Sequence, residues 1–375
     1  MSEGLDGGCV GGVSWRSRGV VSKKLVILGF GILVILANPD LVPTDGRAPS
    51  KKPFQSWVKK GRIIAPGFAG PQSQSRVSAP SIVRLKNGQL RMYFWATGGG
   101  RHYIYAAEAS PKNLYDWKLV GAEPVLGPSP SGNINDKGPS FPWVVQQDDR
   151  WLMYYVTWGS WAPPDELSNR TGLAISDDEG IHWKVLKEPL LPLGKPGEYD
   201  AGVTGSVAVL KTGPQTYQMW YTAGERYAIL DWISPGYKRG IVHIGHAVSG
   251  DGIDWVKRQK PVLSPRLDAV KPYEAVVSKP GIILMNGTYH MWLSVFTMQE
   301  GGGYRLNYAR SRDGLAWERF ADEEVMPLTP GGFDSNHQSY ANVIEHGDEL
   351  WMFYVGNTFG ATGIGLATMK KSDLR

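Results

Sequence analysis

The segment Ala79-Pro-Ser-Ile-Val-Arg-Leu-Lys-Asn-Gly-Gln-Leu-Arg-Met-Tyr93 decides the fold, because its parts recur along the chain. Its last residues open a short apolar motif, Met-Tyr-Phe, that we predict to be a β-strand. Four similar motifs follow, at spacings of 61, 66, 72 and 61 residues. The five anchors are Met92-Tyr-Phe94, Met153-Tyr-Tyr155, Met219-Trp-Tyr221, Met291-Trp-Leu293 and Met352-Phe-Tyr354. Self-similarity at a regular interval indicates repeated structural units.

A second motif, Ser-x-Asp-(x)-Gly-x-x-Trp, follows three of the anchors and marks a stereotyped turn. Its copies run from Ser176 to Trp183, Ser249 to Trp255 and Ser311 to Trp317, and a degenerate copy runs from Ser110 to Trp117. Each Trp begins a short strand that ends in Pro. One such strand, from Trp57 to Pro66, precedes the first anchor, whereas the last repeat ends before its own copy.

Four strands in each of five repeats predict an all-β fold, a five-bladed β-propeller whose last blade is closed by an N-terminal strand. A β-sandwich is the alternative architecture. Two independent markers that repeat together favour the propeller.

Composition limits the classes of function. The chain has 375 residues, 42% hydrophobic and 11% aromatic, which is enough for a large core and excludes a disordered protein. The single cysteine, Cys9, excludes disulfides within the fold and a cysteine metal site. Residues 1–62 hold ten Lys and Arg against four acids, and the remainder holds 30 against 31. A near-neutral body excludes nucleic acid as a partner.

An N-terminal apolar run predicts export. Residues 25–37 are thirteen apolar residues behind Lys23 and Lys24. This length suits a secretory signal and is short of the roughly 20 residues of a membrane span. We expect residues 1–37 to be a signal peptide or an N-terminal anchor, 38–53 a linker and 54–375 the propeller. The protein is then periplasmic or extracellular, with membrane contact only through residues 25–37 if these are retained.

Three successive blades carry a carboxylate at the same place, just before the predicted innermost strand. The three residues are Asp136, Asp200 and Glu274. We expect them at the mouth of the central channel, where innermost strands begin. Other residues are predicted at this mouth from the same strands and from the loops after the anchors: Arg76, His102, Lys137, Trp158, Trp161, Glu225, Arg226, Lys279, Asp334, Asn336 and His337.

Acids, indoles and cations around a concave mouth fit a sugar. Aromatic faces cover the apolar side of a sugar ring, and two facing carboxyl groups supply the acid and base of glycoside hydrolysis. Crowding of three acids would raise the pKa of at least one of them. The opposite face receives the uniform turns, which we interpret as structural. No phosphate-binding Gly loop and no metal-binding or nucleophile motif is found, so we expect no metal and no cofactor.

The repeats resemble the superfamily of five-bladed propellers that includes arabinanases, β-xylosidases, invertases and mannoside phosphorylases. The resemblance covers residues 54–375, through the segment quoted above, Gln218-Met-Trp-Tyr-Thr-Ala-Gly224 and the Ser-x-Asp-Gly-x-x-Trp turns. It implies a carbohydrate-active protein. The three catalytic acids of the arabinanase and invertase pattern fall, position by position, on Ala79, Gly205 and Ser278, and none of these exchanges a proton.

A hydrolase would therefore need a different site. We predict Glu274 as the acid, Asp200 or Asp136 as base or nucleophile, and Arg76, Lys137, Lys279 and His337 as ligands of substrate or anion. Two further functions stay open: a non-catalytic glycan-binding propeller, favoured by the missing triad, and a phosphorylase or transferase, favoured by the cations. In each case the partner is an oligosaccharide or polysaccharide.

Overall fold

The computed structural model describes residues 52–159, 169–225, 241–267, 274–297 and 303–374. The predicted leader at residues 1–37, Trp161 and Arg226 lie outside these ranges. Residues Lys51–Arg375 form one compact unit. Within the described ranges, no helix has the length and apolar character needed to cross a bilayer.

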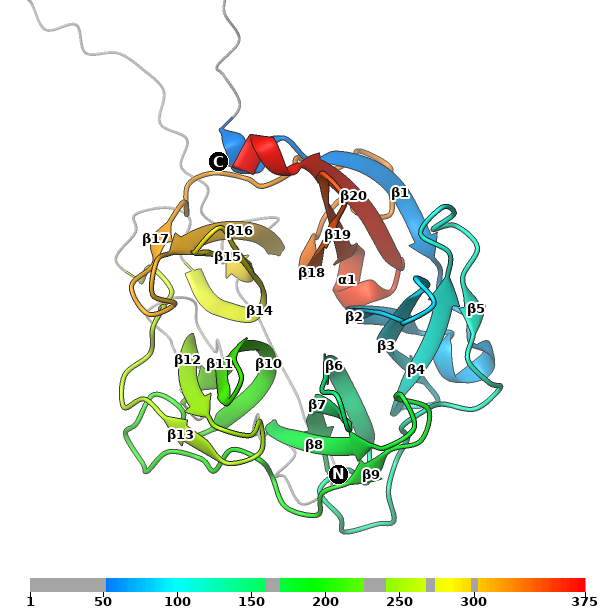
Figure 1. Cartoon of the computed structure of the whole chain (residues 1–375), viewed down its shortest axis with the longest axis vertical. Helices are drawn as coiled ribbons and strands as arrows, with labels where there is room; N and C mark the ends of the chain where they lie inside the picture. Colours follow the sequence, from blue (N-terminus) through cyan, green and yellow to red (C-terminus); the bar gives the residue numbers. More distant parts are fainter. Residues whose placement is uncertain (1–51, 160–168, 226–240, 268–273, 298–302, 375) are drawn as a thin grey trace, which may run out of the picture. The chain divides into compact units, whose positions relative to one another are not determined.

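Antiparallel strands arranged in consecutive groups of four make up this unit (Figure 1). Each group runs from an innermost strand through an anchor strand to a short outermost strand. The first group holds β2 Arg76–Arg84, β3 Leu90–Gly98, β4 Arg101–Ala109 and β5 Lys118–Leu119. The second holds β6 Gly138–Gln146, β7 Trp151–Trp158, β8 Arg170–Ser176 and β9 Lys184–Val185.

The next two groups repeat this order. The third holds β10 Val203–Gly213, β11 Thr216–Gly224, β12 Val242–Ser249 and β13 Trp255–Lys257. The fourth holds β14 Glu274–Met285, β15 Thr288–Thr297, β16 Tyr304–Ser311 and β17 Glu318–Arg319. Single parallel bridges, Thr204 to Arg170 and Val242 to Val276, join the second, third and fourth groups into one sheet.

The last group takes its fourth strand from the other end of the unit. It holds β18 Ser339–His346, β19 Glu349–Val355 and β20 Ile364–Lys370, and β20 pairs antiparallel with β1 Val58–Ile64. The predicted pairing of an N-terminal strand with the last repeat is therefore observed. The helical segments are short: η1 Pro53–Gln55, η2 Gly70–Ser73, α1 Asn357–Gly360 and η3 Lys371–Leu374.

The innermost strands surround a common centre. Strand β2 contacts β6, β6 contacts β10, β10 contacts β14, β14 contacts β18, and β18 contacts β2 (Figure 1). Apolar clusters fill the spaces between neighbouring groups, and the methionine of every predicted anchor is fully buried within them. Burial of these faces between adjacent sheets is the main stabilising contribution.

The Ser-x-Asp-Gly turns connect the third strand of a group to its outermost strand and bind the anchor strand of the preceding group, as their structural interpretation requires. In the turn from Ser249, the hydroxyl accepts hydrogen bonds from the N–H groups of Asp251 and Gly252, at 3.2 and 2.9 Å. The Gly252 carbonyl accepts a hydrogen bond of 2.7 Å from the hydroxyl of Tyr154, an anchor residue of the preceding group. The turns after β8 and β16 dock on the preceding anchor strands in the same way. The repeated turn thus holds neighbouring groups together.

Candidate functional site

A β-bulge interrupts every innermost strand at the same place. The register shifts fall at Ser78/Ser81, Ser140/Trp143, Thr204/Val207, Ser278/Gly281 and Ser339/Asn342. In four of the strands the bulge contains a residue with left-handed φ: Ala79 at 47°, Phe141 at 50°, Lys279 at 43° and Tyr340 at 56°. Bulges re-aim side chains, and here they determine which residues face the centre.

A pocket of about 330 Å³ lies at this centre and is lined by residues from all five innermost strands. Its volume is at the lower end of ligand pockets, roughly 300 to 1,000 Å³, which suits a ligand of one or two rings. Its walls combine aromatic rings with cations and hydroxyl groups. The lining includes Arg76, Trp95, Phe141, Trp158, Ser206, Thr222, Ser278, Lys279, Tyr304, Tyr340 and Phe359, and no Asp or Glu of the described chain.

Arg76 enters the pocket between two aromatic rings. Its guanidinium carbon lies 5.3 Å from the ring centre of Trp95 and 5.8 Å from that of Phe359, both within cation–π range. Its Nε is buried and has no hydrogen-bond partner among the described residues. Burial lowers the pKa of Arg76, against a raising effect of Tyr340. Because an arginine stays protonated, the pocket contains a fixed positive charge.

Three stacked rings form one side of the mouth. His102 stacks on Trp95 at 5.5 Å and on Trp158 at 4.9 Å, with interplanar angles of 18° and 2°. The Trp95 indole N–H donates to Nδ1 of His102 at 3.0 Å, and the Trp158 indole N–H donates to the Ser140 hydroxyl at 2.6 Å. Burial, with the charges of Arg76 and Lys137, lowers the pKa of His102 to about 4. The imidazole is therefore neutral at pH 7 and orients the indoles.

Lys279 is the second cation of the pocket and is 1% exposed. Its Nζ lies 4.9 Å from the Trp143 ring centre and 3.4 Å from the Val207 carbonyl oxygen. Its backbone N–H donates to the Thr222 hydroxyl at 3.0 Å, which fixes the bulge. Burial lowers the pKa of Lys279 to about 7. A lysine with this pKa changes charge near neutral pH.

The acids predicted to be catalytic have different surroundings. Glu274, 2% exposed, begins β14 and binds two arginines of its own group. Arg319 donates to its two oxygens at 2.7 and 3.0 Å, and Arg266 donates through its backbone N–H at 2.9 Å and through Nε at 3.1 Å. Both carboxylate oxygens are therefore occupied. This arrangement ties the start of β14 to the outermost strand β17.

Asp200 has an equivalent environment in the third group. One of its oxygens accepts 2.6 Å and 2.8 Å hydrogen bonds from Nζ of Lys257 and the hydroxyl of Tyr221. Asp334 repeats this arrangement in the last group, with Lys59 at 2.5 Å and Tyr354 at 3.1 Å. Burial acts to raise the pKa of Asp334, but hydrogen bonds, first among them that from Lys59, outweigh it and lower the pKa. Both lysines come from outermost strands, so each of these acids also links the segment before an innermost strand to the outermost strand of the same group.

Each of the three acids predicted at the mouth of the central channel has a partner within the protein. Asp200 and Glu274 bind cations of their own groups, and Asp136 accepts a 2.9 Å hydrogen bond from the Gly132 N–H in the loop before β6. None of the three lines the central pocket. The sequence placed these acids correctly before the innermost strands, but it could not show that two of them form ion pairs with cations from outermost strands. A catalytic role for them stays a prediction that this geometry disfavours.

Three of the other predicted site residues line the pocket, and the rest of those described do not. Arg76, Trp158 and Lys279 line the pocket. Lys137, Glu225 and Asn336 are exposed and are not among its lining residues. His337 is half-buried, its Nδ1 accepts a 3.2 Å hydrogen bond from the Thr358 N–H, and burial and Arg305 lower its pKa.

Sequence reasoning missed several lining residues. Trp95, Phe141, Tyr304, Tyr340 and Phe359 were not predicted. The sequence held a signal for two of them: Phe141 and Tyr340 stand directly before Pro142 and Ala341, at the same aligned position as Lys279.

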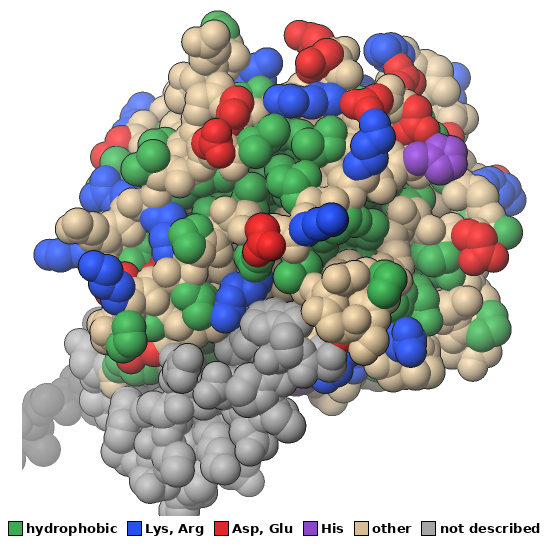
Figure 2. Space-filling view, turned by 90° about the horizontal axis from the view of Figure 1, so that it is seen from below, with side chains coloured by type: hydrophobic (Ala, Val, Ile, Leu, Met, Phe, Trp, Pro, Cys, Tyr) green, Lys and Arg blue, Asp and Glu red, His purple; other side chains and the backbone are tan. Residues whose placement is uncertain are grey.

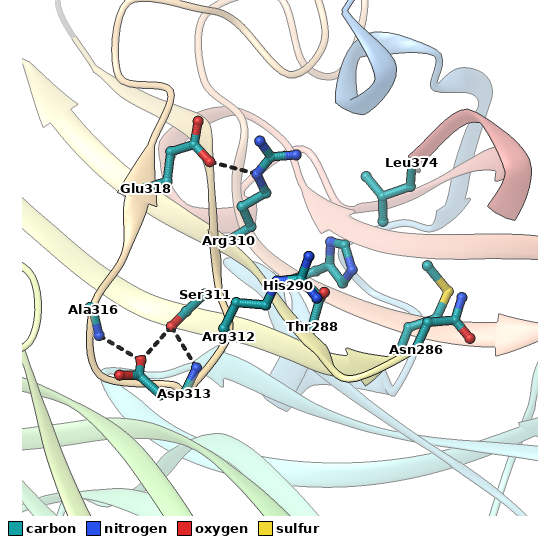
Figure 3. A pocket seen from close by; sticks show the side chains of 11 residues that line it. Asn286, Thr288, His290, Arg310, Ser311, Arg312, Asp313, Ala316, Glu318 and Leu374 are labelled. Atoms are coloured by element: carbon teal, nitrogen blue, oxygen red, sulfur yellow. Dashed lines mark hydrogen bonds and ion pairs between the residues drawn. The ribbon is translucent and has the colours of Figure 1, made fainter.

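A second groove, of about 600 Å³, lies between the end of β14, the turn after β16 and Leu374 (Figure 3). Its polar groups largely bind one another: Arg310 donates to Glu318 at 2.6 Å, and Asp313 accepts from the Ser311 hydroxyl and the Ala316 N–H. Side chains of both charges are interspersed on the side of the molecule seen in Figure 2. Within the described ranges, no cluster of His, Cys, Asp and Glu is arranged to hold a metal ion.

Comparisons with known proteins agree with this fold. No protein-family model matches the chain. Two proteins of Mycobacterium tuberculosis described as uncharacterised are each 27% identical over 323 residues, which is 84% of this chain and 99% of theirs. A 1,2-β-oligomannan phosphorylase of a Thermoanaerobacter species is 28% identical over 148 residues, 35% of this chain and 49% of that protein.

Solved structures extend the likeness over most of the chain. A glycoside hydrolase has a TM-score of 0.64 at 20% identity, covering 84% of this chain and 93% of its own. A thermostable family-43 glycoside hydrolase has a TM-score of 0.57 at 18% identity, with 78% and 89% covered. A third structure comes from the GH130 family of mannoside phosphorylases, which contains glycoside hydrolases that target β-1,2 mannosidic linkages. It has a TM-score of 0.58 at 15% identity, covering 87% of this chain and 93% of its own. The resemblance to propeller glycoside hydrolases and mannoside phosphorylases is thus confirmed, and it shows the fold.

Proposed function

We propose that the chain is a carbohydrate-active five-bladed β-propeller, closed by β1, whose ligand site is the central pocket. The cycle of contacts among β2, β6, β10, β14 and β18 supports the five blades. The single observation that carries the function is the central pocket itself, with stacked indoles on one side and Arg76 and Lys279 in its wall. Aromatic faces pack against the apolar side of sugar rings, and donors from Arg, Lys and hydroxyl groups satisfy sugar oxygens.

The pocket supports recognition of a sugar more directly than it supports hydrolysis. Acid and base catalysis of glycoside cleavage uses two carboxyl groups across the scissile bond. The described lining of the pocket contains no carboxyl group, and the buried Asp200 and Glu274 are bound to cations. This observation favours the second candidate, a glycan-binding propeller. A phosphorylase needs a cationic anion site, and Arg76 with Lys279 supplies that charge.

One experiment separates the three activities. The full chain is incubated with neutral and acidic oligosaccharides, including β-1,2-linked mannooligosaccharides, with and without inorganic phosphate. Bound sugar and released reducing ends or sugar phosphate are measured separately. Release without phosphate identifies a hydrolase, release that requires phosphate identifies a phosphorylase, and binding without release identifies a glycan-binding protein.

Matched aromatic variants locate the site. Trp158→Ala removes one indole of the stack, whereas Tyr115→Ala removes a 61% exposed ring outside the pocket. We expect loss of sugar binding or turnover only in the first variant. If no sugar of the panel binds or reacts with the wild-type protein, the proposed function is wrong. We also propose that residues 1–37 direct export, which fractionation of cells expressing the full chain would test.

A further inference from the structure

Buried acids within the strand groups are paired with cations, whereas the cations of the central pocket are not paired with acids of the described chain. In the third, fourth and last groups, a buried acid binds a cation from the outermost strand: Asp200 with Lys257 at 2.6 Å, Glu274 with Arg319 at 2.7 Å, and Asp334 with Lys59 at 2.5 Å. The two cations of the central pocket, Arg76 and Lys279, have no carboxylate partner among the described residues. These three salt bridges neutralise buried acids within their own groups, whereas the two cations that line the central pocket have no such partner in the described ranges.

The guanidinium of Arg76 is positioned to bind an anionic group. The Trp95 and Phe359 rings restrict its guanidinium, and the planar donors of arginine match the geometry of a carboxylate or phosphate. The backbone that presents Phe359 is itself unusual: Thr358 and Phe359 both have left-handed φ, 49° and 58°. Consecutive non-glycine residues in this conformation are costly and concentrate at functional sites. A buried, unpaired Nε costs free energy as well, unless a ligand completes it.

We infer that the sugar taken by the central pocket carries an oxyanion, a carboxylate or a phosphate ester, and that Arg76 binds this group while the indole stack binds the ring. The inference rests on the proposed function and adds the chemical class of the ligand. Lys279 adds positive charge to the same wall. A neutral sugar offers the Arg76 donors only hydroxyl oxygens and leaves the positive charge of the guanidinium uncompensated, so the pocket favours a sugar that carries an anionic group.

The test compares matched pairs of small ligands by isothermal titration calorimetry with the full chain. D-glucuronate is compared with D-glucose, D-galacturonate with D-galactose, and D-mannose 6-phosphate with D-mannose; inorganic phosphate alone is a further arm. We expect at least one acidic sugar to bind about tenfold or more tightly than its neutral partner, and more weakly as salt is raised. The size of the preference measures the contribution of the charged group.

Two arginine variants assign the residue. Arg76→Met removes the charge but keeps a long apolar side chain between the rings, whereas Arg312→Met removes an exposed charge in the second groove (Figure 3). The first variant should lose about tenfold to a hundredfold in affinity for the acidic sugar and much less than that for the neutral one. The second should behave as wild type. Thermal unfolding of both variants checks that they are folded.

The outcomes separate this inference from the proposed function. Neutral and acidic partners that bind equally well, or equal loss for both in Arg76→Met, would overturn the oxyanion assignment while the sugar site stands. Tight binding of inorganic phosphate with no preference among the sugars would place the oxyanion on a separate co-substrate and also overturn it. If no sugar binds at all, the proposed function fails first.

Discussion

Glu274 provides the sharpest contrast between a catalytic and a structural carboxylate. The side chain is 2% exposed and accepts two hydrogen bonds from Arg319 and two from Arg266. Glu274→Gln removes the negative charge and places an amide against guanidinium donors. Removing one partner of a buried ion pair costs about 3–5 kcal/mol, because the remaining charge is left uncompensated. For a domain of this size that corresponds to a fall in Tm of roughly 5–10 °C.

The assay is thermal unfolding of wild type, Glu274→Gln and the control Glu318→Gln. Glu318 lies beside Arg319 in β17, and its ion pair with Arg310 is exposed, 57% and 48% for the two side chains. A surface pair contributes about 0–1 kcal/mol, so the control should lose at most 2 °C. If Glu274→Gln keeps the wild-type Tm but loses sugar turnover, Glu274 is catalytic and the structural assignment is refuted.

Three further predictions concern single side chains. Lys279→Met should stabilise the protein by a few kcal/mol at pH 6 in urea unfolding: the pKa of Lys279 falls from 10.5 to about 7 on folding, so the penalty of its buried charge is complete below pH 7 and disappears as pH rises towards 10.5. An equal gain at pH 6 and pH 9 would contradict this. Asp334→Asn should destabilise the protein by about 3 kcal/mol at pH 7, because Lys59 of β1 loses its partner. Folding lowers the pKa of Asp334 below 3.8, so the stability that its carboxylate contributes is complete above pH 3.8 and is lost as the pH falls below that value. If the Tm difference between wild type and variant is the same at pH 7 and pH 3, the assignment is wrong. Trp158→Ala should cost about 2 kcal/mol of sugar binding in calorimetry, and unchanged affinity would exclude the stack from the site.

The fold was readable from the sequence because it rests on local patterns. The anchor motifs predicted buried strands, and the Met residues that mark them are fully buried. The turn motif predicted a structural element: its hydroxyl group fixes the turn, and its glycine carbonyl binds the preceding group. The pairing of β1 with β20 followed from the absent strand of the last repeat. Each of these features depends on residues that are close in sequence or on motifs that recur along the chain.

The site was less predictable because its partners are distant in sequence. Glu274 and Arg319 are 45 residues apart, and Lys59 and Asp334 are 275 apart. Sequence reasoning identified the acids before the innermost strands but could not assign their cations, so it predicted catalytic acids where the structure has ion pairs of Asp200 and Glu274. The aligned prolines marked the position of the bulges, but the sequence did not show which side chains the bulges turn towards the centre. The bulges turn Lys279 and Tyr340 towards the centre, so the pocket is aromatic and positive.

The most direct test of the account is a crystal structure of the full chain with the oligosaccharide that binds most tightly in the panel. We expect a sugar ring against Trp158 and an acidic group within hydrogen-bonding distance of the Arg76 guanidinium. A sugar bound instead against Asp200 and Glu274, with their lysine and arginine partners displaced, would contradict the account and restore the acidic site.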